Sequence, residues 1–208
     1  MLEIDYAAPM AKRIDPDVRR EQVADAVIEE IAENGLRSVT LARIAARSGL
    51  AIGSIRHYFG DTLREVMRFT LTVLMQRVAG RDAALSTDPL TRIADAVTFT
   101  APTSDQERKE NTALVEYRVM ARTDPELAAD IAATSALSAD LLASALRDAM
   151  ADRKIDAAAL HREALLLHAV VEGLSFGSAL YSAPLEEKDV HEAITASLRR
   201  LRDAYPPA

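Results

Sequence analysis

A short stretch near the N-terminus restricts the possible folds more than any other part of the chain. Residues 40–59 read TLARIAARSGLAIGSIRHYF, with apolar residues at helical spacing on both sides of Ser48-Gly49-Leu50. The small side chain of Ala45 would allow two helices to cross closely, and Gly49 would adopt the left-handed conformation of the turn. Leu50 would fill the core beneath that turn. This spacing predicts a helix-turn-helix whose second helix would lie in a DNA major groove. The apolar positions are Leu41, Ile44, Ala45, Ile52, Ile55, Tyr58 and Phe59.

The outward side of the second helix carries groups that suit DNA. Gly53, Ser54, Arg56, His57 and Tyr58 are small or hydrogen-bonding residues, of the kind that contact phosphates and base edges. An ordinary helical hairpin with a polar outer face would show the same pattern, so the turn alone leaves both interpretations open.

The flanking sequence resembles a known family. Residues 19–73 are similar to the N-terminal domain of TetR/AcrR-type transcriptional regulators through three features: a first helix ending in Asn34-Gly35, the Val-Thr-x3-Ile-Ala-x3-Gly-Leu run, and the closing His-Tyr-Phe of residues 57–59. Residues 164–201 resemble, more loosely, the closing helices of BetI-like members of that family. The resemblance implies an all-α protein, with a three-helix DNA-binding domain followed by a larger helical domain for ligand binding and dimerisation.

The resemblance also assigns roles to single positions. Thr40 and Arg43 would contact the DNA backbone, and Gly53 would let the recognition helix approach closely. Arg56 is the best candidate for reading a base, because Arg pairs with guanine through two hydrogen bonds. The predicted DNA contacts are Thr40, Arg43, Ile52, Gly53, Ser54, Arg56, His57, Tyr58 and Thr62.

Three positions in and beside the predicted recognition helix depart from the family pattern. Ala51 stands where Ser or Thr is common, and Thr62 where a Lys usually follows the Tyr-Phe pair. The phosphate contact expected from Thr62 is therefore uncharged and weaker. Ile52 would either touch a thymine methyl group or be buried against its own domain, and the sequence leaves both open.

Capping residues predict the boundaries of the helices. Asp15-Pro16 is typical of a helix start, Asn34-Gly35 of a helix end, and Thr40 of an N-cap. We expect an N-terminal arm over 1–14, the DNA-binding domain over 15–60, a linking helix over 61–82 and the C-terminal domain over 83–208. Prolines divide that last domain into helices at 88–100, 105–122, 124–151, 156–181 and 186–204.

Composition agrees with a helical, intracellular protein. Of 208 residues, 49% are hydrophobic, with 7 Gly, 8 Pro and no alternating strand pattern. The absence of Cys removes disulfides and thiolate metal sites, and the acidic N-terminus is unlike a signal peptide. The most apolar helix is interrupted by His168 and Glu172, so we expect no membrane span and a cytoplasmic, nucleoid-associated protein.

The charge is unevenly distributed. The chain carries a net charge of −7, which is unusual for a protein that binds a polyanion. Residues 35–68, however, hold six arginines against two acidic residues, a local charge of +4. We expect this segment to meet phosphates, although a solvated charged surface is an equally open interpretation of any single arginine.

The last two predicted helices are candidates for a dimer interface. The helix over 156–181 is apolar almost all round, as expected of a helix buried on both sides, and 186–204 has one apolar stripe. In the resembled family two such helices from each chain form a four-helix interface. The alternative is a monomer that buries both helices internally.

A ligand pocket is implied by the resemblance, and its residues are weakly specified. Arg118, His161 and Ser175 are further polar candidates, but we select Glu116, Tyr117, Met120, His168, Glu172 and Phe176 as the predicted pocket. His168 and Glu172 share a helical face, yet two ligands are too few for a stable metal site. A hydrogen-bonded pair, and plain core packing for the aromatic residues, are the competing interpretations.

These observations favour a sequence-specific DNA-binding regulator without a cofactor. It would most simply be a homodimeric repressor that a small-molecule effector releases from a palindromic operator. An architectural DNA-binding protein without an effector would look similar. An enzyme is disfavoured, since the sequence has no P-loop, GxGxxG after a strand, HExxH or GxSxG motif.

Overall fold

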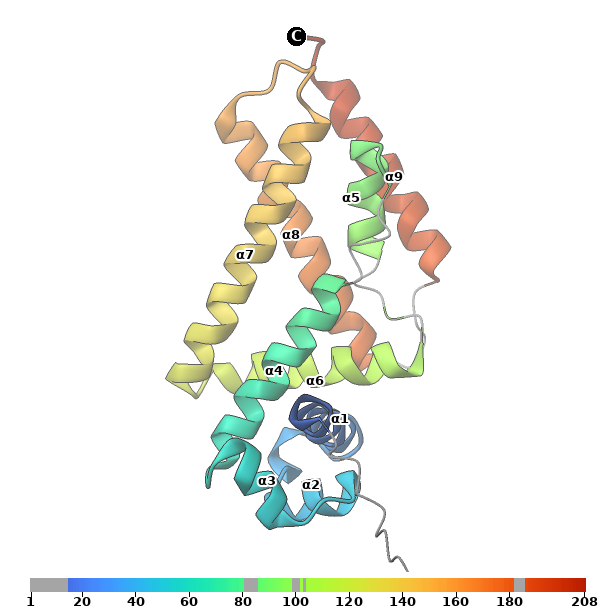
Figure 1. Cartoon of the computed structure of the whole chain (residues 1–208). Coiled ribbons are helices and arrows are strands. Elements are labelled where there is room, and N and C mark those ends of the chain that lie inside the picture. Colours follow the sequence, from blue (N-terminus) through green and yellow to red (C-terminus); the bar gives the residue numbers. More distant parts are fainter. Residues whose placement is uncertain (1–14, 81–85, 99–101, 103, 182–185) are drawn as a thin grey trace, which may run out of the picture.

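The protein is helical throughout the part that the structure describes. The computed structural model describes residues 15–80, 86–98, 102, 104–181 and 186–208, and within them the only strand-like feature is an isolated bridge between Arg153 and Pro207. The all-α prediction is therefore confirmed (Figure 1). The elements are α1 (Pro16–Asn34), the 3-10 turn η1 (Leu36–Ser38), α2 (Leu41–Ser48), α3 (Ile52–Phe59), α4 (Leu63–Gly80), α5 (Pro89–Thr98), α6 (Asp105–Ala121), α7 (Pro125–Ala149), α8 (Ala157–Leu180) and α9 (Glu187–Ala204).

Local chemistry accounts for the helix ends. The Asp15 side chain accepts a hydrogen bond from the Asp17 amide at 2.9 Å, and the Thr40 hydroxyl accepts one from the Arg43 amide at 3.2 Å. Gly35 follows α1 with a φ of 78°. These caps satisfy amides that the first helical turn leaves unpaired. The five predicted C-terminal helices are also found, with described ends within two residues of the predicted ones, while residues 99 and 100 at the predicted end of the first lie outside the described residues.

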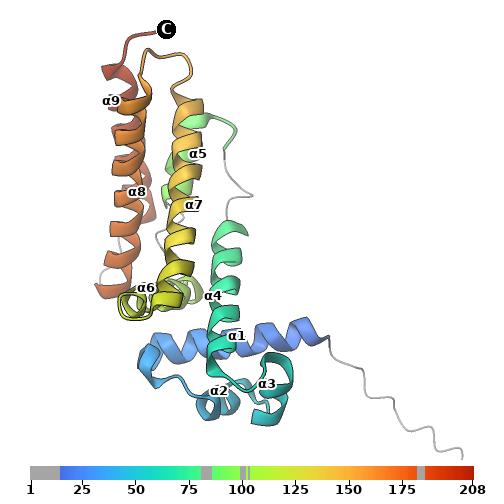
Figure 2. The same cartoon turned by 90° about the vertical axis from the view of Figure 1, so that its left-hand side faces the viewer.

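The first core joins the helices of the predicted DNA-binding domain to the rest of the chain. Buried apolar side chains of α1, α2 and α3 pack together with Val66, Leu71 and Leu74 of α4. The same core continues into α6 through Leu114 and Tyr117. Figure 2 shows α1 lying across α4 and beneath α6. The predicted boundary at residue 60 stays a prediction, and the core crosses it.

A second core holds the helices at the far end of the molecule. Ile93 and Val97 of α5 pack with Leu146 of α7, Leu167 of α8 and Leu198 of α9. Asp156 caps α8 by accepting from the Ala159 amide at 2.7 Å. In Figures 1 and 2, α7 and α8 run side by side away from the DNA-binding helices.

Within a single chain, helix α8 is buried along one face only, so the expected burial on both sides would need a second copy of the protein. Leu165, Leu166, Phe176 and Leu180 are exposed in the single chain, whereas Leu167 and Val171 are buried. In α9 the apolar stripe points inward, because Leu198 belongs to the second core. The pattern of apolar residues in α8 shows that both faces suit burial. It does not show whether the helix that covers each face belongs to the same chain or to another copy.

Two helices are more apolar than the sequence argument allowed. By length and composition, α7 and α8 could each cross a membrane, with hydropathies of 1.2 and 1.3 over their most apolar windows. His168 and Glu172 do not by themselves remove α8 from this class, because the Ala and Leu residues around them outweigh two polar side chains. Both helices contribute to the second core, as apolar helices of a bundle do.

Candidate DNA-binding surface and ligand cavity

The turn between α2 and α3 has the geometry that the sequence predicts. Gly49 adopts the left-handed conformation with a φ of 70° and a ψ of 12°, where a side chain would be strained. Gln22 of α1 donates to the Ser48 carbonyl at 2.6 Å, which holds the turn against α1. Ile44 and Ile55 are fully buried beneath it. The angle of α3 is therefore set by buried contacts and not by solvent-exposed residues.

The predicted contact residues of α3 occupy its outer face. Gly53, Arg56 and His57 are exposed, and Ser54 and Tyr58 are half-buried. Ile52 keeps an exposed fraction of 36%, which favours the surface role over burial. Figure 2 shows α2 and α3 at the end of the molecule remote from the C-terminus.

Gly53 has no internal reason to be glycine. Its φ lies outside the left-handed region, and a Cβ atom built on it would have no neighbour within 4 Å. Glycine in a helix costs about 1 kcal/mol relative to alanine, and the predicted DNA contact would be one compensating role, because glycine lets the helix approach a DNA backbone closely.

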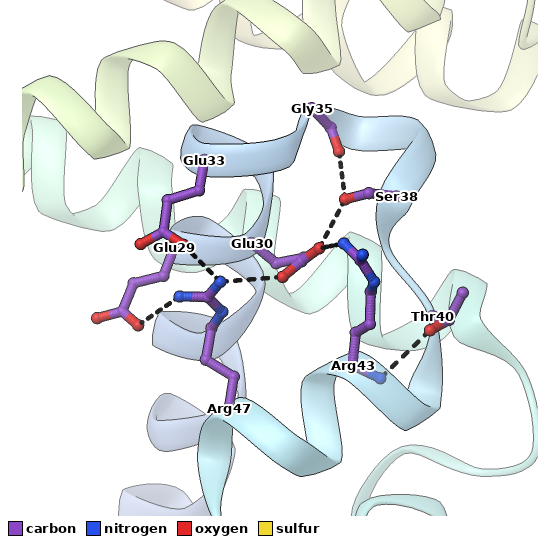
Figure 3. A network of polar contacts seen from close by, with 8 residues as sticks. All are labelled: Glu29, Glu30, Glu33, Gly35, Ser38, Thr40, Arg43 and Arg47. Atoms are coloured by element: carbon purple, nitrogen blue, oxygen red, sulfur yellow. Dashed lines mark hydrogen bonds and ion pairs between the residues drawn. The ribbon is translucent and has the colours of Figure 1, made fainter.

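Glu30 anchors α2 to α1 through a buried ionic network (Figure 3). Its carboxylate is 3% exposed and accepts hydrogen bonds from Ser38 at 2.8 Å, from Arg47 at 3.1 Å and from Arg43. Burial opposes ionisation of Glu30, but these donors outweigh it and lower its pKa to about 2. Arg47 also binds Glu33 at 2.7 Å and Glu29 at 3.4 Å.

This network neutralises part of the positive charge counted in residues 35–68. Arg43 and Arg47 point to carboxylates of α1 that lie outside the counted segment. Arg64 pairs with Glu126 of α7, and Arg68 Nε lies 3.6 Å from Asp130 Oδ2. The charge of +4 is thus largely compensated within the fold. The sequence count missed these pairs because their partners are distant along the chain.

Three of the predicted DNA contacts are exposed to solvent in positions close to the helix-turn-helix surface. Arg56 is 54% exposed, and its 3.8 Å pair with Asp61 is open to solvent on both sides, so this pair restrains it little. Thr62 is exposed just before α4. Arg43 is 51% exposed despite its bond to Glu30, so its contact with DNA would compete with that bond.

A cavity of about 460 Å³ lies between α4, α6, α7 and α8. Its walls are mostly aliphatic, and no aromatic ring lines it within the described ranges. The volume falls in the range of about 300–1,000 Å³ that is typical of small-molecule sites. The lining residues are Leu74, Met75, Val78, Ala96, Glu110, Asn111, Leu114, Arg118, Ile131, Ala133, Thr134, Ser135, Leu137, Ser138, Leu141, Leu142, Val171, Glu172 and Ser175.

Polar groups in the cavity form one connected cluster between α6 and α8. Arg118 donates to Ser175 Oγ at 3.1 Å and pairs with Glu172 at 3.1 Å. Ser175 Oγ donates to Asn111 Oδ1 at 2.7 Å, and Asn111 Nδ2 donates to the Ser175 carbonyl at 2.8 Å. The cluster is electrically balanced, because one guanidinium faces one carboxylate.

The predicted pocket residues do not all meet in this cavity. Glu172 lines it, and the other five are absent from its walls. Tyr117 is buried in the first core, where its hydroxyl donates to the Met67 carbonyl at 2.9 Å and burial raises its pKa. Glu116 accepts from the Leu36 amide at 3.3 Å. Met120 and Phe176 are 40% and 46% exposed.

Sequence reasoning had no signal for Asn111, and it offered Ser175 only as a further polar candidate. Asn111 lies within the polar run DQERKENT at the start of α6, which reads as solvated surface. Ser175 was a weak candidate because a lone Ser in an apolar helix is common. Only the crossing of α6 and α8 brings both beside Arg118.

His168 and Glu172 form a side-chain pair. His168 Nε2 lies 3.8 Å from Glu172 Oε1 and 3.5 Å from Ser135 Oγ. Within the described part of the chain, no group of three or more His, Cys, Asp or Glu residues is arranged to hold a metal. The 3.8 Å separation is too long for a hydrogen bond between His168 and Glu172, and the hydrogen-bond contact of His168 is with Ser135.

Known families account for most of the chain. Residues 24–62 match the family of bacterial regulatory proteins called tetR. Residues 89–203, more than half of the chain, match the C-terminal domain of BetI-type transcriptional repressors. The chain belongs to the TetR family of transcriptional regulators. The resemblance read from the sequence is thereby confirmed.

Individual relatives of this regulator support the assignment. It is 29% identical over 179 residues to the HTH-type transcriptional regulator BetI of Paraburkholderia phytofirmans, covering 83% of this chain and 87% of the relative. PksA of Bacillus subtilis is 28% identical over 116 residues, covering 54% of this chain and 56% of PksA.

Solved structures share the fold. A transcriptional regulator from Rhodococcus sp. Rha1 superposes with a TM-score of 0.76 at 23% identity, covering 89% of this chain and 97% of the other. A regulator from Saccharomonospora viridis, crystallised with choline, has a TM-score of 0.75 at 15% identity, covering 88% and 96%.

Membership in this family states the function in general terms. The protein is a DNA-binding transcriptional repressor, not an enzyme, of a family whose members dimerise and carry a ligand-binding C-terminal domain. Members are soluble cytoplasmic proteins. The apolar side chains of α7 and α8 therefore serve packing within a helical bundle.

Proposed function

We propose that this repressor binds a palindromic operator as a homodimer and leaves it when a small molecule fills the cavity between α4, α6, α7 and α8. The observation that carries the proposal is the position of α4. This helix starts directly after the DNA-binding helices and lines the cavity with Leu74, Met75 and Val78. A ligand there touches the element that orients the recognition helix.

The exposed face of α8 supports a dimer. Leu165, Phe176 and Leu180 are spaced along it and exposed by 51%, 46% and 58%. Gly173 between them would let two helices approach closely. An apolar face of this kind commonly marks a protein interface. We assign α8, with the outer face of α9, to the contact that places two copies of α3 about 34–36 Å apart on successive turns of the duplex.

Two sets of contacts connect the cavity to α4. On one side, the Tyr117 hydroxyl of α6 holds the Met67 carbonyl of α4 at 2.9 Å. On the other side, Arg64 and Arg68 of α4 pair with Glu126 and Asp130 at the start of α7. Helix α7 continues from these pairs into the cavity wall. A ligand that separates α7 from α4 would therefore rotate α4 at its DNA-proximal end.

The coupling required is modest. An effector shifts the balance only by the difference between its affinities for the two conformers. Couplings of about 1–3 kcal/mol, which change operator affinity about 5- to 150-fold, are typical. Small rotations of α4 suffice, because both recognition helices must fit the duplex at once.

Footprinting of the purified protein on DNA upstream of its own coding region tests the proposal. A protected palindrome with a steep dependence on salt supports a dimer that neutralises several phosphates on each half-site. Diffuse, salt-sensitive binding without a preferred site would instead favour the architectural alternative. Operator affinity that no ligand of the cavity alters would refute release by an effector while leaving the repressor function intact.

A further inference from the structure

The cavity differs from a site built for an organic cation. Recognition of quaternary ammonium groups commonly uses the faces of aromatic rings. Here the cavity walls within the described residues are aliphatic side chains, hydroxyls, one amide and three charged groups, without an aromatic ring. The structural neighbour that binds choline therefore provides no direct guide to the ligand of this chain.

Each acidic group of the cavity already has a basic partner. Arg118 pairs with Glu172 at 3.1 Å. Arg77 reaches Glu110 at 3.0 Å, and Gln106 donates to the same oxygen at 3.0 Å. A cationic ligand would compete with Arg118 for Glu172, and an anionic ligand would compete with Glu172 for Arg118. Either charged ligand would lose its hydration in a largely apolar site, and it would leave one member of the Arg118–Glu172 pair without its partner.

The cluster nevertheless keeps hydrogen-bonding capacity. A guanidinium has five N–H donors and a carboxamide has two. The structure assigns two Arg118 nitrogens to Ser175 and Glu172, and the Asn111 amide to the Ser175 carbonyl. The remaining donors suit a neutral oxygen such as a hydroxyl or carbonyl group. Thr134 and Ser135 of α7 also line the cavity, but the Thr134 hydroxyl donates to the Asp130 carbonyl at 2.9 Å and the Ser135 hydroxyl lies 3.5 Å from His168 Nε2.

From this arrangement we infer that the effector is an uncharged, largely apolar molecule with one hydroxyl or carbonyl group, which the Arg118–Asn111–Ser175 cluster binds while aliphatic walls enclose its body. This inference rests on the proposed function, because it names the chemical class of ligand for the same cavity. It excludes compact organic cations and fatty acids as the preferred ligands.

A competition assay tests the charge of the ligand directly. The full-length protein is loaded with N-phenylnaphthylamine, an uncharged probe that fluoresces in apolar sites. Decanol, decanoate, decyltrimethylammonium and choline are then compared as competitors, since the first three share one chain length and differ in charge. We expect decanol to displace the probe at a concentration about tenfold lower than either ion, which corresponds to about 1.4 kcal/mol.

Two charge variants make the test specific to the cluster. Glu172→Gln removes the carboxylate partner of Arg118, so decanoate should gain about tenfold on decanol. Arg118→Gln removes the guanidinium partner of Glu172, which keeps only the 3.8 Å contact with His168, so decyltrimethylammonium should gain by a similar factor. Glu163→Gln, on the same helix but outside the cavity walls, is the matched control and should keep the preference for decanol. Thermal unfolding followed by circular dichroism checks that each variant is folded.

Three results would overturn the inference: preference of the unmodified protein for choline or decyltrimethylammonium, preference for decanoate, or displacement by none of the compounds. A preference for decanol that both charge variants leave unchanged would also overturn it, because the ligand would then bind away from the cluster. The assay contains no DNA, so its failure is separate from failure of operator release, which footprinting reports.

Discussion

Replacing Glu30 with Gln tests how the recognition helix is held. The substitution keeps the size of the side chain and removes its charge. Arg43 and Arg47 would then face a neutral amide in a site where the native carboxylate is 3% exposed. Because Glu30 joins α1 to α2 (Figure 3), the lost interaction lies between helices and bears on the orientation of the helix-turn-helix.

The expected magnitude follows from the pKa of Glu30. Hydrogen bonds from Ser38, Arg43 and Arg47 lower that pKa from 4.5 to about 2 against the effect of burial. At about 1.4 kcal/mol for each pKa unit, the charged form contributes about 3 kcal/mol to the free energy of unfolding. Arg43 is 51% exposed, and solvent weakens its share. We therefore expect Glu30→Gln to lower the free energy of unfolding by about 2–3 kcal/mol at neutral pH.

The same pKa fixes the direction of the pH dependence. A carboxyl group whose folded pKa is lowered stabilises the fold above its unfolded pKa, and the stabilisation is lost as the pH falls from 4.5 towards 2. The difference between the native protein and Glu30→Gln should therefore be constant above about pH 6 and about 1 kcal/mol smaller at pH 4.

Urea unfolding followed by circular dichroism at neutral pH and at pH 4 measures both effects. Glu29→Gln serves as the control, because Glu29 pairs with the same Arg47 at 3.4 Å but is 39% exposed. Its substitution should cost less than about 1 kcal/mol. Equal stabilities of the native protein and Glu30→Gln at neutral pH, or a difference that does not change with pH, would refute the reasoning.

Three further predictions concern DNA binding and assembly. Arg56→Ala should relax specificity at one position of each half-site by about 1–3 kcal/mol, and an unchanged consensus in a binding-site selection would contradict this. Gly53→Ala should raise the thermal stability by up to about 1 kcal/mol yet weaken operator binding in a gel-shift assay, because a Cβ would meet open space in the protein but the DNA backbone in the complex. Phe176→Glu should convert the dimer to a monomer in analytical ultracentrifugation, whereas Val18→Glu, at an apolar residue of α1 that is somewhat more exposed, should leave the dimer intact.

Much of the fold could be predicted from short-range sequence signals. Asp15-Pro16, Asn34-Gly35, Thr40 and Gly49 each act on backbone groups within a few residues, so their effect needs no knowledge of the rest of the chain. The helix-turn-helix and the family followed from such signals. The helices of the C-terminal domain followed from prolines and apolar periodicity in the same way.

The candidate sites depended on contacts that local signals do not carry. The arginines of residues 35–68 looked free because their partners, Glu30 of α1 and Glu126 and Asp130 of α7, are far away in sequence. Tyr117 looked like a pocket residue because it is a polar aromatic in an apolar helix. A rotation of one helical position decides whether such a side chain faces the core or the cavity, and that rotation is set by packing.

The sequence by itself thus determined where each helix begins and ends, the turn at Gly49 and the family, because capping and backbone conformation are local. Tertiary structure alone decided which charges neutralise one another, which face of α8 stays exposed and which residues meet around the cavity. Arg118, Asn111 and Ser175 become one cluster only where α6 crosses α8. Their chemistry towards a ligand depends on distances between residues about sixty positions apart, and no pattern along the chain encodes those distances.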